Sequence, residues 1–302
     1  MNRHASCAVL FGALLLLSCS SDSTSNSSAT TAAQGASTTA AATSTTTTEV
    51  TTTTEASTTT QLTTTTEAPT TTEAPTTSTT IAPAEKIIET RVIGQSVQGR
   101  DITAYRMGTR GARPVLLIGV IHGDEAKGYG ITQMIRTMPT PKGVDLWIID
   151  SINPDGQAAD TRYNANGVDL NRNVSYNWTY IPRTTADGEY SGEAPADQPE
   201  TQALEQFVGE IKPYITMFWH QDANRVSPGG AHREIPMQFA DLVGLSAAST
   251  PCTGGCTGTF TQYINHTIKG GTAFIVELPG NDEVTPAMVK LHAAATLQVI
   301  TL

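Results

Sequence analysis

Four short apolar runs have the length and the β-branched content of buried strands. The stretches between them place apolar residues at helical spacing, as Leu204, Phe207 and Val208 show. The expected strands cover 115–121, 144–149, 214–219 and 273–276, and the expected helices include 128–137 and 199–211. This alternation predicts an α/β fold whose central sheet is mixed, largely parallel and flanked by helices.

Polar residues of catalytic type directly follow these runs. His122 and Glu125 come after the first run, His220 after the third, and Glu277 after the fourth. The carboxyl ends of parallel strands share one edge of an open α/β sheet, where ligands bind. Two imidazoles and a carboxylate are a common ligand set of catalytic zinc. The pattern predicts one Zn²⁺ per chain on His122, Glu125 and His220, although the His-x-x-Glu spacing alone also suits a polar turn with a solvated carboxylate.

A second polar stretch makes the pattern specific. Residues 153–156 read Asn-Pro-Asp-Gly, and residues 162–173 read Arg-Tyr-Asn-Ala-Asn-Gly-Val-Asp-Leu-Asn-Arg-Asn. Together with Gly-Gln-Ser-Val-Gln-Gly-Arg at 94–100, they resemble the M14 family of zinc metallocarboxypeptidases. The resemblance runs in family order from about residue 92 to residue 302. The His-Gly-Asp-Glu turn is similar to the short bacterial branch of the family, which includes murein peptide amidases.

The resemblance implies a role for each matched residue. His122, Glu125 and His220 would bind zinc, and Glu277 would act as the general base on the zinc-bound water. Arg162 would stabilise the oxyanion of the transition state. Asn171 and Arg172 would bind a substrate carboxylate, Arg172 bidentately. Without the resemblance, both arginines could be surface loop residues and Glu277 a strand-end carboxylate.

Some polar residues receive no catalytic role. Tyr263 is the only tyrosine between His220 and Glu277, where digestive members of the family use one, but it lies closer to Glu277 than that role requires. Asp124 is expected to be a loop residue or a neighbour of the metal ligand Glu125. The remaining histidines are expected on the surface, in the packing or in the leader: His4, His232, His266 and His292.

The N-terminal quarter of the chain differs in composition from the rest. Residues 1–18 combine Arg3 with a ten-residue apolar run, which predicts a signal peptide. The following Cys19 resembles the lipidated cysteine of bacterial lipoproteins, so residues 19–84 are interpreted as a lipidated cysteine and a disordered Thr-rich stalk. We therefore expect an exported protein, lipid-anchored on the outer face of the bacterial cytoplasmic membrane. The alternative is a secreted protein with an ordinary signal peptide.

The remainder, 85–302, has the size of one catalytic domain. The formal net charge of −10 and the absence of a Lys/Arg cluster argue against nucleic acid as a partner. In an exported protein the closely spaced Cys252 and Cys256 predict a small disulfide loop, with zinc binding by the two thiols as the minor alternative.

Three functions fit these observations. The first is a zinc peptidase or amidase that cleaves a bond near a free carboxyl terminus in peptidoglycan stem peptides, namely γ-D-glutamyl-diaminopimelate. The second is a general extracellular metallocarboxypeptidase that acts on L-peptides. The third is a non-catalytic, wall-binding lipoprotein, which predicts the loss of a metal ligand or of the base. The sequence retains all of these residues.

Overall fold

The computed structural model describes residues 87–184, 188–249 and 256–302. The signal peptide, the lipidated Cys19 and the Thr-rich stalk lie outside these ranges and stay predictions. Within the described ranges, no helix combines the length and the apolar character that crossing a membrane requires.

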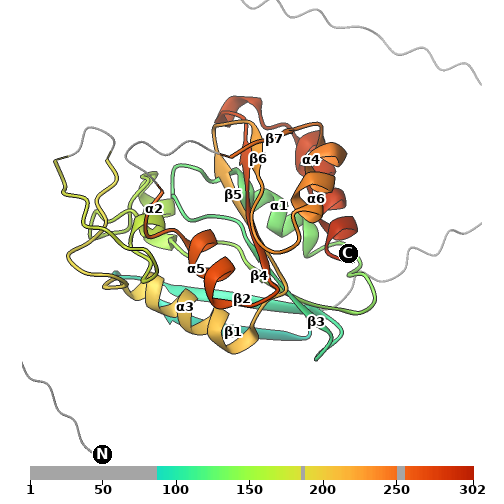
Figure 1. Ribbon diagram of the computed structural model, residues 1–302, viewed down its shortest axis with the longest axis horizontal. Coiled ribbons are helices and arrows are strands. Elements are labelled where there is room, and N and C mark those ends of the chain that lie inside the picture. The colour runs from blue at the N-terminus through green and yellow to red at the C-terminus, as the bar shows by residue number, and fades with distance from the viewer. Residues whose placement is uncertain (1–86, 185–187, 250–255) are drawn as a thin grey trace, which may run out of the picture. The chain divides into compact units, whose positions relative to one another are not determined.

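An eight-stranded mixed sheet forms the centre of the described part (Figure 1). Its spatial order is β1-β2-β4-β3-β5-β8-β6-β7. Strands β4, β3, β5 and β8 are parallel, while β2 joins β4, β1 joins β2, and β6 joins β8 in antiparallel pairs. The predicted mixed sheet with a parallel centre is confirmed. The strands are β1 (Glu89–Gln95), β2 (Asp101–Gly108), β3 (Arg113–Ile118), β4 (Val144–Ile149), β5 (Ile215–Gln221), β6 (Arg225–Ser227), β7 (Ser246–Ala247) and β8 (Thr272–Leu278).

The four predicted strands are present, but the ends of three differ from the prediction. β3 ends at Ile118. A Cβ on the next residue, Gly119, would lie 2.6 Å from the carbonyl oxygen of Asp150, and the backbone after Gly119 bonds to the loop that follows β4. The carbonyl oxygen of Val120, for example, accepts from the backbone N–H of Ile152. His220 and Glu277 lie inside β5 and β8 rather than beyond them, because the β5–β8 ladder extends past the apolar runs.

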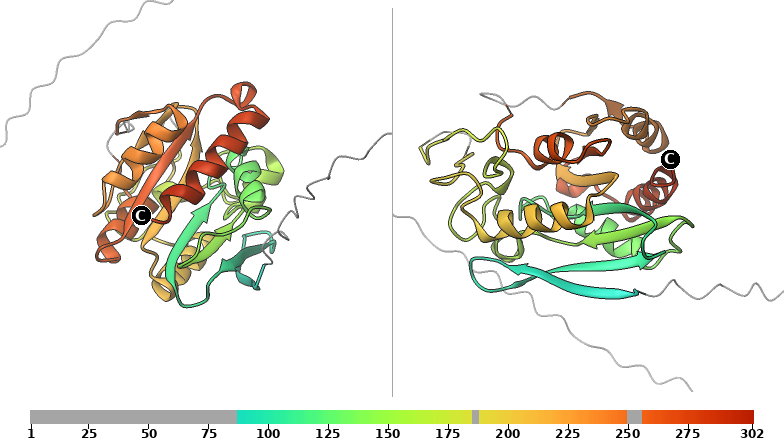
Figure 2. Two further views of the ribbon diagram at one scale, coloured as in Figure 1. Left: turned by 90° about the vertical axis from the view of Figure 1, so that its right-hand side faces the viewer. Right: turned by 60° about the horizontal axis from the view of Figure 1, so that its bottom comes forward.

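Helices cover both faces of the sheet (Figure 2). Buried residues of α1, α4 and α6 belong to the hydrophobic cluster on one face, and those of α3 and α5 belong to the cluster on the other face. The two predicted helices correspond to α1 and α3, and α3 has the predicted bounds. The helices are α1 (Lys127–Ile135), α2 (Pro154–Ala159), α3 (Pro199–Ile211), α4 (Glu234–Val243), α5 (Phe260–Thr267) and α6 (Pro286–Val299), with single 3₁₀ turns at η1 (Leu170–Arg172) and η2 (Asn281–Glu283).

The central strands read as continuous apolar runs because both of their faces are buried. Along β3, Val115 and Leu117 pack into the cluster beneath α1, α4 and α6, whereas Leu116 and Ile118 pack into the cluster beneath α3 and α5. Successive side chains of a strand point to opposite faces, so a strand covered on both sides needs no polar alternation.

The β1–β2 turn is fixed to the first turn of α2 through a buried carboxylate. Asp155 accepts hydrogen bonds from Ser96 Oγ at 2.8 Å and from the backbone N–H of Gln98 at 2.9 Å, and it pairs with Arg100. Burial raises the pKa of Asp155, but these donors outweigh burial and lower the pKa below its ordinary value. The Gly-x-Ser-x-x-Gly-Arg stretch that supported the family resemblance is therefore structural and does not line the pocket described below.

Candidate active site

Two of the three predicted metal ligands lie in the turn between β3 and α1. His122 is 2% exposed, and Glu125 follows two residues before α1 begins at Lys127. The turn packs closely on α2: a Cβ placed on Gly123 would come within 2.0 Å of the carbonyl carbon of Gly156, so only glycine fits. Asn153 donates from Nδ2 to the carbonyl oxygen of Ile121 at 2.9 Å, which fixes the backbone just before His122.

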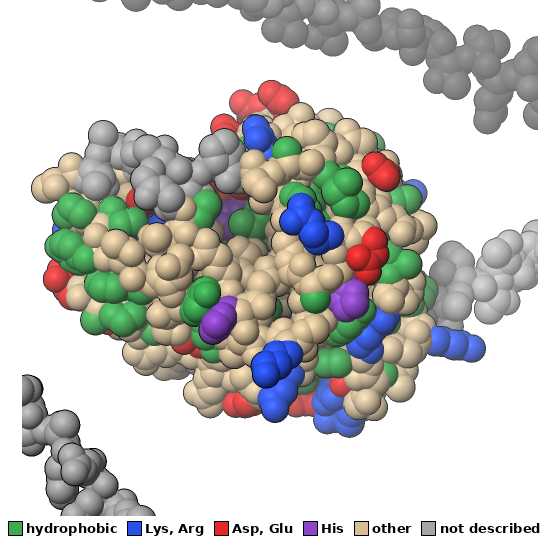
Figure 3. All heavy atoms as spheres, viewed as in Figure 1, with side chains coloured by type: hydrophobic (Ala, Val, Ile, Leu, Met, Phe, Trp, Pro, Cys, Tyr) green, Lys and Arg blue, Asp and Glu red, His purple; other side chains and the backbone are tan. Residues whose placement is uncertain are grey.

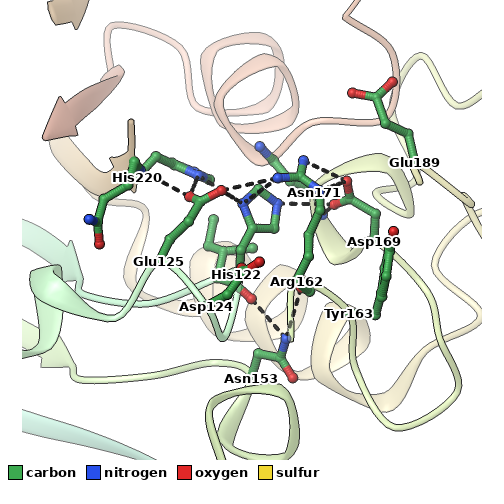
Figure 4. Close-up of polar contacts among 12 residues, drawn as sticks. His122, Asp124, Glu125, Asn153, Arg162, Tyr163, Asp169, Asn171, Glu189 and His220 are labelled. Atoms are coloured by element: carbon green, nitrogen blue, oxygen red, sulfur yellow. Dashed lines mark hydrogen bonds and ion pairs between the residues drawn. The ribbon is translucent and has the colours of Figure 1, made fainter. Parts of the chain in front are cut away.

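His220 reaches the same point from β5, the neighbour of β3 (Figure 4). Its Nδ1 lies 3.2 Å from His122 Nδ1 and 2.9 Å from Glu125 Oε2, and His122 Nδ1 lies 2.7 Å from Glu125 Oε1. Tetrahedral zinc with bonds of about 2.0–2.1 Å holds its ligand atoms roughly 3.3 Å apart. Two imidazole nitrogens and a carboxylate that converge at these separations fit a zinc ion.

Asp169 orients the first of these imidazoles. Its Oδ1 lies 3.1 Å from His122 Nε2 and its side chain is fully buried. With the proton on Nε2 directed to Asp169, Nδ1 presents its lone pair toward Glu125 and His220, as a metal ligand requires. Burial alone would lower the pKa of His122, but the carboxylates of Glu125 and Asp169 outweigh burial and raise the pKa to about 9. The same negative field favours a metal cation at this point.

Arg162 lies beside the metal ligands and is held by the same aspartate. Its Nε and one terminal nitrogen donate to Asp169 Oδ2 at 3.0 and 2.8 Å, and its other terminal nitrogen donates to Glu125 Oε1 at 3.0 Å. Burial opposes the guanidinium charge, but the two carboxylates outweigh burial and raise the pKa of Arg162 above its ordinary value. A fixed positive charge next to the metal ligands suits the predicted interaction with a substrate carbonyl oxygen.

Asn171 and Arg172 lie on η1, a few residues after Asp169. Asn171 Oδ1 accepts from the backbone N–H of Phe260 at 3.1 Å, which leaves its amide nitrogen as the donor toward ligands. Arg172 donates to its neighbour's carbonyl oxygen at 2.8 Å and forms an ion pair with Glu189. The guanidinium Nε of Arg172 is buried and has no hydrogen-bond partner within the described ranges.

Glu277 lies on β8 directly opposite His220 in the β5–β8 ladder and is 7% exposed. It lines a pocket of about 490 Å³, together with the other predicted metal, catalytic and substrate-binding residues. Figure 3 shows a hollow on this face of the molecule, with a histidine side chain visible inside it. Within this one pocket the structure brings together His122, Glu125, Arg162, Asn171, Arg172, His220 and Glu277.

The sequence model of the zinc carboxypeptidase family matches residues 77–234, more than half of the chain. The chain belongs to the zinc carboxypeptidase family. The matched segment contains the three predicted metal ligands, Arg162 and the Asn171–Arg172 pair, whereas Glu277 lies beyond it.

Murein peptide amidase A of Escherichia coli strain K12 is 30% identical over 142 residues, which are 43% of this chain and 58% of the relative. The match therefore spans little more than half of the length of that relative. Mast cell carboxypeptidase A of Homo sapiens is 36% identical over 105 residues, which are 32% of this chain and 24% of the relative. The crystal structure of a murein-tripeptide amidase from Escherichia coli O157 shares the fold with a TM-score of 0.56 at 24% identity, over 69% of this chain and 91% of that chain.

Three further expectations for this zinc carboxypeptidase chain concern residues around the pocket. Tyr263 packs against the cluster beneath α3 and α5 and is absent from the pocket lining. Asp124 is exposed, and its carbonyl oxygen accepts from Asn281 Nδ2 at 3.3 Å. Cys256 lines the pocket and is disulfide-bonded, while its predicted partner Cys252 lies outside the described residues.

The unassigned histidines within the described ranges lie apart from the pocket. His232 pairs with Glu234, and His266 stacks on Tyr176 with ring centroids 3.9 Å apart. His292 is buried in α6, and its two ring nitrogens have no hydrogen-bond partner among the described residues. None of the three lines the pocket.

Two charged residues of the site were missed at the level of sequence. Asp169 stands two positions before Asn171 in the motif, but an aspartate in a polar loop gives no signal of its own that it faces a histidine 47 positions earlier. Glu189 lies in a stretch without periodicity, so only the fold brings it to Arg172.

Proposed function

We propose that this protein is a zinc-dependent amidase that cleaves the γ-D-glutamyl-diaminopimelate bond of peptidoglycan stem peptides. The observation that carries the proposal is the pocket itself. It joins a His-Glu-His ligand set to a glutamate, an arginine beside the ligands and a second arginine further along the lining. The names of the murein amidases among the relatives support the substrate.

The residues of the pocket have separate roles in amide hydrolysis. When bound by His122, Glu125 and His220, zinc supplies a Lewis acid that brings the pKa of water toward neutrality. Glu277 takes a proton from the attacking water and delivers it to the leaving amine nitrogen as the C–N bond breaks. Arg162 stabilises the negative charge that develops on the carbonyl oxygen.

Arg172 and Asn171 determine which bond of the substrate is cleaved. A guanidinium binds a carboxylate through two parallel hydrogen bonds, which fixes both the place and the orientation of the bound group. A carboxylate of the leaving residue held there places the preceding amide carbonyl near Arg162 and the metal ligands. The enzyme would therefore act next to a free carboxyl group.

The expected signal peptide and lipidated Cys19 support the choice of substrate. An enzyme anchored on the outer face of the cytoplasmic membrane, on a stalk of residues 19–84, works in the compartment that holds peptidoglycan. Export and anchoring are part of this proposal, and labelling of the full chain with a radioactive fatty acid, compared with Cys19→Ala, tests the lipid.

A general metallocarboxypeptidase is the second candidate, favoured by the match to mast cell carboxypeptidase A. The purified, zinc-supplemented full chain should be incubated with L-Ala-γ-D-Glu-meso-diaminopimelate and with blocked L-dipeptides. We expect release of free diaminopimelate from the tripeptide. Hydrolysis of the L-peptides alone would refute the cell-wall substrate in favour of the second candidate.

The activity of the Glu277→Gln variant distinguishes the two candidate enzymes from a non-catalytic binding protein. We expect this variant to keep its zinc and to lose at least about 10³-fold in kcat, because the amide cannot accept the proton. Unchanged turnover in Glu277→Gln would contradict the assignment of the base.

A further inference from the structure

Glu189 is a pocket residue that the steps of hydrolysis do not use. Its carboxylate forms an ion pair with Arg172, the guanidinium expected to bind the substrate carboxylate, and it lines the same pocket as the metal ligands. The side chain of Glu189 is 15% exposed and that of Arg172 is 7% exposed. An anion is therefore already present where an anionic substrate group must bind.

The position of Glu189 is fixed by the residues that follow it. The carbonyl oxygen of Tyr190 accepts from the backbone N–H of Asp169 at 2.8 Å, and Asp169 bonds to His122. The guanidinium of Arg183 lies 4.0 Å from the centre of the buried Tyr190 ring. The contacts of Tyr190 thus connect the segment that carries Glu189 to the metal-ligand end of the pocket.

The charges around the pocket determine what a leaving residue must carry. Arg162 is engaged by Asp169 and Glu125, so Arg172 is the guanidinium that faces both Glu189 and the substrate. A leaving residue that offers only a carboxylate would put two like charges on one guanidinium in a half-buried place, which costs free energy. A leaving residue that offers a carboxylate and an ammonium group would pair with both side chains and add no net charge.

We propose that Glu189 determines specificity by binding the ammonium group at the distal end of the leaving residue, while Arg172 binds the carboxylate next to the scissile bond. The substrate class is then a peptide whose leaving residue is a diamino acid. The distal carbon of meso-diaminopimelate carries such an ammonium group. This inference rests on the proposed function and assigns the preference for the leaving residue to Glu189.

The sharpest test uses two substrates that differ in the ammonium group alone. γ-D-Glu-meso-diaminopimelate and γ-D-Glu-2-aminopimelate share the scissile bond and both carboxylates of the leaving residue. For the full chain with zinc we expect kcat/KM to be at least about tenfold higher for the diamino substrate, mainly through KM. Glu189→Gln should bring this ratio close to one, chiefly by raising KM for the diamino substrate.

Glu193→Gln is the matched control. Glu193 lies in the same loop, bonds to the Tyr190 hydroxyl and does not line the pocket. The same loss of charge there should leave the substrate ratio at its wild-type value. An equal fall in kcat/KM for both substrates in Glu189→Gln would mean that Glu189 has a structural role. An equal rise in kcat/KM would mean that Glu189 only competes with the substrate for Arg172. Either result overturns the proposal. Asp222 is another carboxylate that lines the pocket, and a preference that disappears in Asp222→Asn but persists in Glu189→Gln overturns it as well.

Binding of the leaving residues, acetylated on the nitrogen of the scissile bond, separates this inference from the proposed function. Calorimetry with N-acetyl-meso-diaminopimelate and N-acetyl-2-aminopimelate, which differ in the distal ammonium group alone, measures the same preference in zinc-loaded Glu277→Gln without turnover. If neither peptide is cleaved but the diamino compound binds at least about tenfold tighter in a Glu189-dependent way, the proposed function fails and the role of Glu189 stands. Equal affinities, or no binding of either compound, would refute the role of Glu189.

Discussion

Two arginines of the pocket each pair with a carboxylate, and the two pairs differ in burial and in the number of hydrogen bonds between the partners. In the Arg162–Asp169 pair, two guanidinium nitrogens bond to one oxygen of a fully buried carboxylate, whose other oxygen faces His122. In the Arg172–Glu189 pair, one nitrogen contacts a carboxylate that is partly exposed in the pocket. The first pair is part of the support of the metal site, whereas the second can exchange partners with a ligand.

The electrostatics of the Arg162–Asp169 pair agree with that support role. Burial raises the pKa of Asp169, but Arg162 and His122 outweigh burial and hold the pKa far below its ordinary value. The carboxylate therefore stays charged to a lower pH than a free aspartate would. A permanent charge behind His122 keeps the imidazole in one tautomer, so the metal end of the pocket is organised before substrate arrives.

The largest effect should come from breaking the first pair. Asp169→Asn keeps the size of the side chain but removes the charge that orients His122 and compensates Arg162. Loss of such an outer partner lowers metal affinity by about 10–100-fold, and we expect this loss in zinc affinity measured by competition with a chelator. Asp241→Asn, an exposed change on α4, is the control. Wild-type zinc affinity in Asp169→Asn would show that Asp169 does not support the site.

A smaller and different effect should come from the second pair. Arg172→Lys keeps the positive charge but loses the planar fork that binds a carboxylate bidentately. We expect KM for the tripeptide to rise by about 10–100-fold, the worth of a charge-assisted hydrogen bond, with zinc affinity unchanged. Arg183→Lys is the matched control outside the pocket. A fall in zinc affinity in Arg172→Lys would erase the distinction between the two pairs.

The smallest effect on the site should come from His292, a titratable group outside both pairs. It lies in α6 against Phe239, and burial lowers the pKa of His292 from 6.5 to about 4. The unfolded chain therefore takes up a proton between pH 6.5 and 4 while the folded protein does not, so stability falls as the pH falls through this range. The loss amounts to about 3 kcal/mol below pH 4.

His292→Leu removes this particular loss. The free energy of unfolding, measured by urea denaturation, should fall less in the variant than in the wild type when the pH is lowered from 7 to 4, and the difference should be about 3 kcal/mol. KM and zinc affinity should not change. Any effect of the substitution on packing is independent of pH and cancels in this comparison. A difference in stability that stays constant with pH would contradict the assignment.

The sequence predicts the centre of the fold better than its periphery, for a physical reason. β3, β4, β5 and β8 are covered on both faces, so their apolar runs stand out in the chain. The outer strand β1 alternates between half-buried and exposed positions and gives no such run. The short β6 and β7 depend on pairing within the folded sheet, as in the contacts of Val226 with its partners on both sides.

The residues of the site also differ in how well the sequence predicts them. His122, Glu125, His220 and Glu277 follow apolar runs, so strand-end position and residue type mark them as candidates, and the family resemblance assigns each its role. Their partners carry no such mark. Asp169 and Glu189 occupy irregular segments, and their contacts join residues distant along the chain or depend on a loop conformation that no local pattern encodes.

The central claim is that His122, Glu125 and His220 bind one zinc ion. Zinc per chain, measured by elemental mass spectrometry after dialysis against metal-free buffer, tests it most directly in the wild type and in His220→Ala. We predict one zinc per wild-type chain and a large loss in His220→Ala, because two ligands cannot hold the ion against dialysis. A full equivalent of zinc in His220→Ala, or none in a wild-type protein that still hydrolyses its substrate, would contradict the account.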